Sequence, residues 1–186
     1  MGIEIEKKYL VKEIPKDIDK YPYHVIEQGY LNVSPAIRVR REDDRYYMTY
    51  KAAQPETEGD IGKAEYNLSL DEESYAHMVR KADGIIIRKK RYLIPLNEDA
   101  YDKAYLEKCP DLAGQVDNGD IKIELDVFME PFEGRILAEV EFPDEDAAKN
   151  YKPAAWFAED VTGDRRYSNA YMSTAGISFP QAAPSE

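Results

Sequence analysis

Charged and apolar residues alternate in several short segments of this chain. In the first of them, residues 4–8 (EIEKK), the side chains of Glu4, Glu6 and Lys8 would share one face of a β-strand. The same spacing recurs downstream in four further segments, at Arg38 to Arg40, Lys89 to Arg91, Ile123 to Val127 and Glu139 to Phe142. A period of two indicates β-strands, and strands of this kind could gather carboxylates and cations on one shared surface. Such a surface suits a metal ion and a polyphosphate.

About eight strands are predicted along the chain, near residues 3–11, 25–32, 37–41, 45–52, 64–69, 85–94, 121–129 and 135–142. Helices are predicted over about 72–82, 144–150 and 169–176, the first two with Asp71 and Asp144 as N-caps. The sequence therefore predicts a β-dominated α+β fold, an eight-stranded antiparallel closed β-barrel with helices packed outside.

Residues 97–119 are the least readable part of the sequence. One helix over 100–108 is expected there, and the segment is either a lid at one mouth of the barrel or a surface excursion. We expect residues 1–176 to form a single domain and residues 177–186 to form a C-terminal tail.

Composition narrows the functional classes. The net charge of −12 argues against a generic nucleic-acid binder, which would carry a basic surplus. No apolar run reaches the roughly 20 residues that span a bilayer, so no membrane association is expected. Cys109 is the only cysteine, which excludes an internal disulfide and is typical of a reducing cytoplasm. The oligomeric state is not indicated.

Alternation of charge by itself is also what any half-exposed antiparallel strand shows. If the strands instead close with their charged faces inward, the lumen would contain Glu4, Glu6, Lys8, Arg38, Arg40, Lys51, Glu65, Lys89, Arg91, Glu124, Asp126, Glu139 and Glu141. Burying so many charges without a ligand is unfavourable. A water-filled lumen that binds a metal polyphosphate removes this objection. Because the candidate ligands are carboxylates, Mg²⁺ or Mn²⁺ is favoured over zinc, and neither His24 nor His77 is expected to bind metal.

Eight short motifs follow one another between residues 1 and 175: Glu4-x-Glu6-x-Lys8, Gln28 to Leu31, Arg38-x-Arg40, Thr49 to Lys51, Lys89-x-Arg91-Tyr92, Glu124 to Phe128, Glu139 to Phe142 and Val161 to Asn169. In this order they resemble the CYTH superfamily, the triphosphate tunnel metalloenzymes. The resemblance implies an eight-stranded tunnel that binds a linear triphosphate together with a divalent metal. Members include inorganic triphosphatases, thiamine triphosphatases, class IV adenylate cyclases and RNA triphosphatases.

The resemblance also implies roles for individual residues. Phosphate oxygens would be held by Lys8, Arg38, Arg40, Lys51 and Arg91, and the metal by Glu4, Glu6, Glu139 and Glu141. Further metal ligands or water-positioning residues would be Glu65, Glu124 and Asp126. Lys89 and Tyr30 match a lysine–tyrosine pair that is implicated in activating water in some small relatives. A lysine among other cations should have a depressed pKa, which suits a base, but Lys89 could equally be a phosphate ligand.

The chain departs from the family pattern at Asn67, where a second glutamate is common after Glu65. The neutral amide could weaken or move a second metal site, or relax the substrate preference. The expected function is metal-dependent hydrolysis of tripolyphosphate to pyrophosphate and phosphate. The alternatives are a thiamine triphosphatase, a nucleoside triphosphatase, a class IV adenylate cyclase, or a non-hydrolysing module that binds polyphosphate or nucleotide. Tyr46, Tyr47 and Tyr50 are expected to be packing residues.

Overall fold

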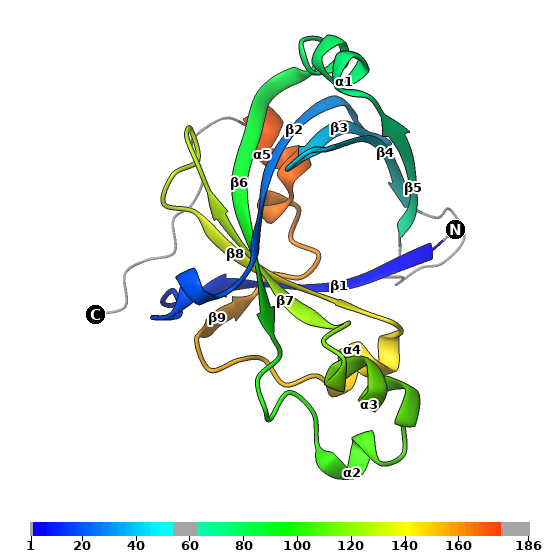
Figure 1. Ribbon diagram of the computed structural model, residues 1–186, viewed down its shortest axis with the longest axis vertical. Coiled ribbons are helices and arrows are strands. Elements are labelled where there is room, and N and C mark those ends of the chain that lie inside the picture. Colours follow the sequence, from blue (N-terminus) through cyan, green and yellow to red (C-terminus); the bar gives the residue numbers. More distant parts are fainter. Residues whose placement is uncertain (1, 54–62, 176–186) are drawn as a thin grey trace.

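The computed structural model describes residues 2–53 and 63–175, with side chains described over 5–51 and 65–175 (Figure 1). This part of the chain is a β-dominated α+β fold. Its strands are β1 (Gly2–Val11), β2 (Tyr23–Val33), β3 (Ala36–Glu42), β4 (Arg45–Ala53), β5 (Lys63–Leu70), β6 (Asp83–Pro95), β7 (Lys122–Phe128), β8 (Ile136–Phe142) and β9 (Phe157–Asp160). Its α-helices are α1 (Glu72–Val79), α2 (Lys103–Leu106), α3 (Pro110–Asp117), α4 (Glu145–Asn150) and α5 (Asn169–Ala175), with 3₁₀ turns at Ile18–Lys20 and Arg165–Tyr167. None of the helices in the described ranges has the length and apolar character that crossing a bilayer requires.

All strand pairings are antiparallel, in the order β5-β4-β3-β2-β6-β7-β8-β1-β9. The sheet curves strongly along this order (Figure 1). At its N-terminal end β1 also pairs with β5, where Gly2–Glu4 register with residues 63–65. The eight strands predicted from alternation are all present, but the prediction of eight was wrong by one. The additional strand, β9, has four residues of which only Phe157 is buried, so its sequence does not alternate with a period of two.

The main apolar core lies on the outer face of the sheet, between β1, β7 and β8 and the helices α2 to α4. Leu125 and Val140 are fully buried there against Tyr101 and Leu112 from the 97–119 segment. This segment contains two helices rather than the single one expected, because Pro110 begins a new helix at its first position. The segment packs on the outer face of the sheet, opposite to the face that carries the charged residues. This is the position of a surface excursion and not that of a lid.

Helix α1 covers the outer face of β2, β3 and β4. Its predicted N-cap is confirmed, because the Asp71 side chain accepts a hydrogen bond from the Ser74 amide. Gly29 of β2 allows the segment that follows α1 to approach closely, since a Cβ on residue 29 would lie 2.6 Å from the Cβ of Ala82. Beyond α1, Tyr50, Tyr66 and Leu68 on the outer face of β4 and β5 remain exposed, although helices were expected to cover that face.

A second apolar cluster occupies part of the inner face. It brings together Tyr30 of β2, Ile87 of β6, Phe128 of β7 and Leu137 of β8, with Met172 of α5 packed against them. A polar lumen was expected, and this cluster is a departure from that expectation. One section of it is charged and another is apolar.

Gly84 and α5 provide a test of how this apolar section is held together. Gly84 has a φ of +71°, and a Cβ would lie 2.2 Å from the carbonyl oxygen of Ser173 in α5. We expect Gly84→Ala to lower the free energy of unfolding by about 2–5 kcal/mol, through backbone strain and overpacking together. Urea denaturation measures this loss.

The matched control is Gly134→Ala, where φ is +87° and no atom lies within 4 Å of the added Cβ. Only the backbone strain of about 1–2 kcal/mol applies at that position. Equal losses for the two variants would show that the contact with α5 contributes nothing.

Candidate active site

The strand register brings the predicted site residues to one face of the sheet. Residues directly opposite each other on paired strands point to the same side. The pairs that connect the inner face are Glu6 with Glu141, Lys8 with Glu139, Glu139 with Glu124, Asp126 with Arg91, Lys89 with Ile26, Gln28 with Arg40, Tyr30 with Arg38, Arg38 with Thr49, Thr49 with Asn67, and Lys51 with Glu65. Every candidate except Glu4 can be placed in this way. The side chain of Glu4 lies outside the described residues, although its backbone registers with residue 63 of β5.

Arg91 is the centre of the first charged group. Its Nε and Nη2 each donate to Asp126 at 2.7 Å, and Nη2 also donates to Glu139 at 2.6 Å. Nη1 donates to Glu124. Burial by itself would lower the pKa of Arg91, but the nearby charges of Asp126 and Glu124 outweigh it and the pKa is raised well above its usual value.

Glu139 is shared between two cations. Besides Arg91 it contacts Lys8, whose Nζ lies 2.8 Å from the Oε1 of Glu139 and 3.9 Å from the carboxylate of Glu6. Burial would raise the pKa of Glu139, but Lys8 and Arg91 hold it well below the usual range. Burial would likewise lower the pKa of Lys8, yet Glu139 and Glu6 raise it. At neutral pH both groups are charged.

Lys89 is the most enclosed cation of the site, with no solvent exposure. Its Nζ donates to Asp126 and lies 5.5 Å from the centre of the Phe128 ring. The pKa of Lys89 is lowered to about 8, first by burial and then by the neighbouring charge of Arg91, which also binds Asp126. The depressed pKa was predicted from nearby cations, whereas burial is its larger cause.

Tyr30, the predicted partner of Lys89, lies in the apolar section of the inner face. Its hydroxyl accepts a long hydrogen bond of 3.5 Å from the Gln28 amide. Between the described atoms of Tyr30 and Lys89 there is no hydrogen bond. The joint action of these two residues therefore stays a prediction.

A second charged group lies on β3, β4 and β5. The Oε2 of Glu65 is 3.7 Å from the Nζ of Lys51 and 4.0 Å from a guanidinium nitrogen of Arg38. Asn67 donates to the Oε1 of Glu65 at 2.9 Å and accepts from the Thr49 hydroxyl at 2.6 Å. An amide at position 67 can do both, whereas a carboxylate there would face Glu65 with a like charge.

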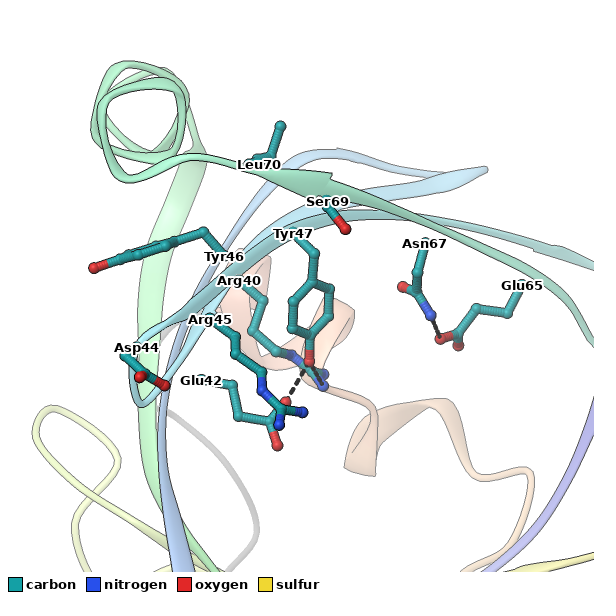
Figure 2. A pocket seen from close by; sticks show the side chains of 10 residues that line it. All are labelled: Arg40, Glu42, Asp44, Arg45, Tyr46, Tyr47, Glu65, Asn67, Ser69 and Leu70. Carbon is teal, nitrogen blue, oxygen red and sulfur yellow. Dashed lines mark hydrogen bonds between the residues drawn. The ribbon is translucent and has the colours of Figure 1, made fainter.

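Arg40 lies beside a cavity of about 540 Å³ bordered by β3, β4 and β5 (Figure 2). Its Nε donates to Gln28 at 3.0 Å and its Nη1 to the hydroxyl of Tyr47 at 3.1 Å. Tyr47 in turn donates to Glu42. The sequence interpretation of Tyr47 as a packing residue was wrong, and Gln28 and Glu42 were not among the predicted site residues. The available signal was that Tyr47 shares the parity of Thr49 and Lys51 on β4.

The comparisons with known proteins agree with this geometry. The family model described as CYTH domain matches residues 2–167. The chain belongs to the CYTH family. A relative from Nitrosomonas europaea named inorganic triphosphatase is 32% identical over 174 aligned positions, and the alignment covers 91% of this chain and 96% of that protein. A second relative of the same name, from Acetivibrio thermocellus, is 31% identical over 179 aligned positions, and the alignment covers 92% of this chain and 94% of the relative.

The fold of this CYTH protein also matches a solved relative. The crystal structure of an inorganic triphosphatase superimposes with a TM-score of 0.61 at 29% identity, covering 97% of this chain and 99% of the other. The match extends over almost the whole length of both chains, so the β-dominated fold with its curved sheet is that of the family.

Carboxylates on β1 and β8 are the candidate metal ligands of this CYTH protein. Glu6 and Glu141 lie opposite each other in the β1–β8 register, and Glu139 follows on the same face. Among the side chains that the structure describes, no three acidic, histidine or cysteine groups converge to form a metal site. The His24 ring instead forms a hydrogen bond with Asp43, with its Nδ1 2.6 Å from a carboxylate oxygen.

Proposed function

We propose that this CYTH protein hydrolyses inorganic triphosphate to pyrophosphate and phosphate on the inner face of its sheet, with the help of a divalent metal ion. The observation that carries the proposal is the gathering of Lys8, Arg38, Arg40, Lys51, Lys89 and Arg91 on one face, from strands far apart in the sequence. A linear triphosphate offers anionic oxygens along its whole length, which suits cations spread in this way. The names of both relatives, which align with more than nine-tenths of this chain, support the same substrate.

A closed eight-stranded tunnel is part of this proposal. The register of Gly2–Glu4 with residues 63–65 supports it, because this contact joins β5 to β1, which are the two ends of the strand order when the short β9 is left aside. Within such a tunnel the phosphates would be surrounded by cations and largely removed from water. Electrostatic attraction is stronger in that environment than in solvent.

The arginines of β3 favour an anion between them. Burial first, and then the charge of Arg38, hold the pKa of Arg40 below its usual value. Two neighbouring guanidinium groups on one face repel each other, and a bound phosphate would relieve this repulsion. Planar guanidinium groups can also grip phosphate oxygens through two parallel hydrogen bonds.

The residues fit a hard divalent ion such as Mg²⁺ or Mn²⁺. Glu6 and Glu141 face each other across two strands, and like charges in this position are unfavourable without a cation between them. We propose that Glu4, Glu6, Glu139 and Glu141 hold the ion, with Glu65, Glu124 and Asp126 as further ligands or water-positioning groups. When bound, the ion would neutralise phosphate charge and lower the pKa of a bound water molecule.

The proposed reaction is the in-line attack of water on a terminal phosphorus. A new bond forms between the water oxygen and phosphorus, the bond to the bridging oxygen breaks, and pyrophosphate leaves. The cations of the inner face stabilise the charge that is spread over the phosphate oxygens. Lys89 either accepts the proton of the attacking water, which its pKa near 8 allows near neutral pH, or binds a phosphate oxygen.

Phosphate release tests this proposal directly. We expect tripolyphosphate to be hydrolysed faster than ATP or thiamine triphosphate in the presence of Mg²⁺ or Mn²⁺. EDTA should abolish the activity, because carboxylates that hold no metal ion repel the anionic substrate, and added Mg²⁺ or Mn²⁺ should restore it. Faster turnover of ATP or thiamine triphosphate would change the substrate assignment, and full activity in EDTA would contradict the metal. Binding of all three compounds without turnover would make the protein a binding module.

A further inference from the structure

Arg40 and Arg91 lie on the same inner face but differ in the charge of their partners. Arg91 is held by carboxylates, whereas Arg40 donates to Gln28 and to Tyr47. Both partners of Arg40 among the described residues are neutral. Its guanidinium is therefore fixed at two nitrogens while its positive charge is not cancelled by a direct ion pair. The side chain is only 8% exposed, so water compensates little of that charge.

Tyr47 is itself held at its hydroxyl group. The hydroxyl donates to Glu42 and accepts from Arg40, and both hydrogen bonds are drawn in Figure 2. Tyr47 lies directly opposite Arg40 in the β3–β4 register, with its ring centre 5.7 Å from the guanidinium carbon. Because the Tyr47 hydroxyl donates its hydrogen bond to Glu42, its oxygen lone pairs are left to accept from Arg40. The carboxylate thus acts on Arg40 through Tyr47.

Gln28 holds Arg40 from the opposite strand. It is fully buried, lies opposite Arg40 in the β2–β3 register and accepts from its Nε. The amide nitrogen of Gln28 donates to Tyr30 at 3.5 Å, which keeps the amide oxygen directed toward Arg40. A guanidinium has more N–H groups than these two bonds use, so the remaining ones are left for an anion.

We propose that Gln28, Tyr47 and Glu42 are positioning residues that hold Arg40 in the orientation in which it binds a phosphate of the substrate. This inference rests on the proposed triphosphatase function. Neutral partners suit the task, because they fix the guanidinium without competing with phosphate for its charge. Since the protein's own groups hold the guanidinium through these hydrogen bonds, less conformational freedom is lost on binding, and their removal should appear mainly in KM.

The test is a mutant cycle on Tyr47 and Arg40, read as steady-state kinetics with tripolyphosphate. Tyr47→Phe removes only the hydroxyl, and we expect KM to rise about tenfold while kcat changes by less than about threefold. Arg40→Lys removes the planar guanidinium, so in that background Tyr47→Phe should raise KM no further. Tyr50→Phe is the matched control, because Tyr50 lies on the exposed outer face of the same strand.

Glu42 provides a second, independent variant pair. Glu42→Ala should raise KM as Tyr47→Phe does, and Glu42→Gln, which still accepts from the Tyr47 hydroxyl, should restore most of the wild-type value. An unchanged KM in Tyr47→Phe, or an equal increase in the Arg40→Lys background, would overturn the inference. A wild-type protein without tripolyphosphatase activity would refute the proposed function instead. Calorimetric binding of tripolyphosphate to wild type and Tyr47→Phe would then test the positioning role separately, with equal affinities counting against it.

Discussion

Replacement of Lys89 by alanine is expected to lower kcat for tripolyphosphate by about 100- to 10,000-fold, with KM changed by less than about threefold. This split is the expected result if Lys89 takes the proton of the attacking water, because a base contributes only in the transition state. The structure supports such a role in two ways. Lys89 is fully buried, and its pKa of about 8 leaves part of the population neutral near physiological pH.

Lys89→Arg separates the two roles left open for this residue. Arginine keeps the positive charge and can bind phosphate, but it does not lose its proton under these conditions. If Lys89 is the base, the arginine variant should be nearly as slow as the alanine variant. If KM rises in Lys89→Ala and Lys89→Arg recovers the activity, Lys89 is a phosphate ligand. Lys90→Ala is the matched control, since Lys90 lies on the other face of β6, 5.0 Å from the centre of the Tyr23 ring.

Replacement of Arg91 by alanine is expected to lower the free energy of unfolding at pH 7 by about 3–5 kcal/mol. The reason is that Asp126, Glu124 and Glu139 all pair with this one guanidinium, and each of these partly or fully buried carboxylates would lose a cationic partner. For a chain of this size the melting temperature should fall by about 10 °C. Calorimetry and urea denaturation in the absence of substrate and metal measure the effect.

The loss caused by Arg91→Ala should also depend on pH. In the wild type the pKa of Glu139 is held low, so this carboxylate contributes stability that is present above its unfolded-state pKa and lost as the pH falls through its folded-state pKa. Removing Arg91 removes part of that contribution. The difference between variant and wild type should therefore be largest at neutral pH and smaller in acid.

Arg88→Ala is the matched control for this stability measurement. Arg88 lies on the same strand but on the outer face, where it is half-exposed and pairs with Glu27 at 2.6 Å. An ion pair at such a position contributes about 1 kcal/mol or less. An equally small loss in Arg91→Ala would contradict the central role of Arg91 in the charged group.

Most of the fold could be predicted because alternation is a local signal. The eight longer strands and the helices capped by Asp71 and Asp144 were found from their own residues. The short strand β9 and the start of α3 at Pro110 were not, since β9 has a single buried residue and α3 follows Cys109, whose side chain makes no capping hydrogen bond. Tyr30 illustrates a different limit. Its parity places it on the inner face, but its apolar surroundings come from β6, β7, β8 and α5.

The sequence by itself determined which side chains share a face of each strand, because the pleat puts residues two apart on the same side. It also determined the chemistry of that face, cations and carboxylates suited to phosphate and a hard metal ion. The tertiary structure decided which charges meet, because partners depend on the register between strands that are distant in the chain, and a slip of one residue would change every pair. Thus alternation placed Glu4, Glu6 and Lys8 on one face. Only the β1–β8 register put Lys8 against Glu139 and Glu6 opposite Glu141, and only the β3–β4 register put Tyr47 against Arg40.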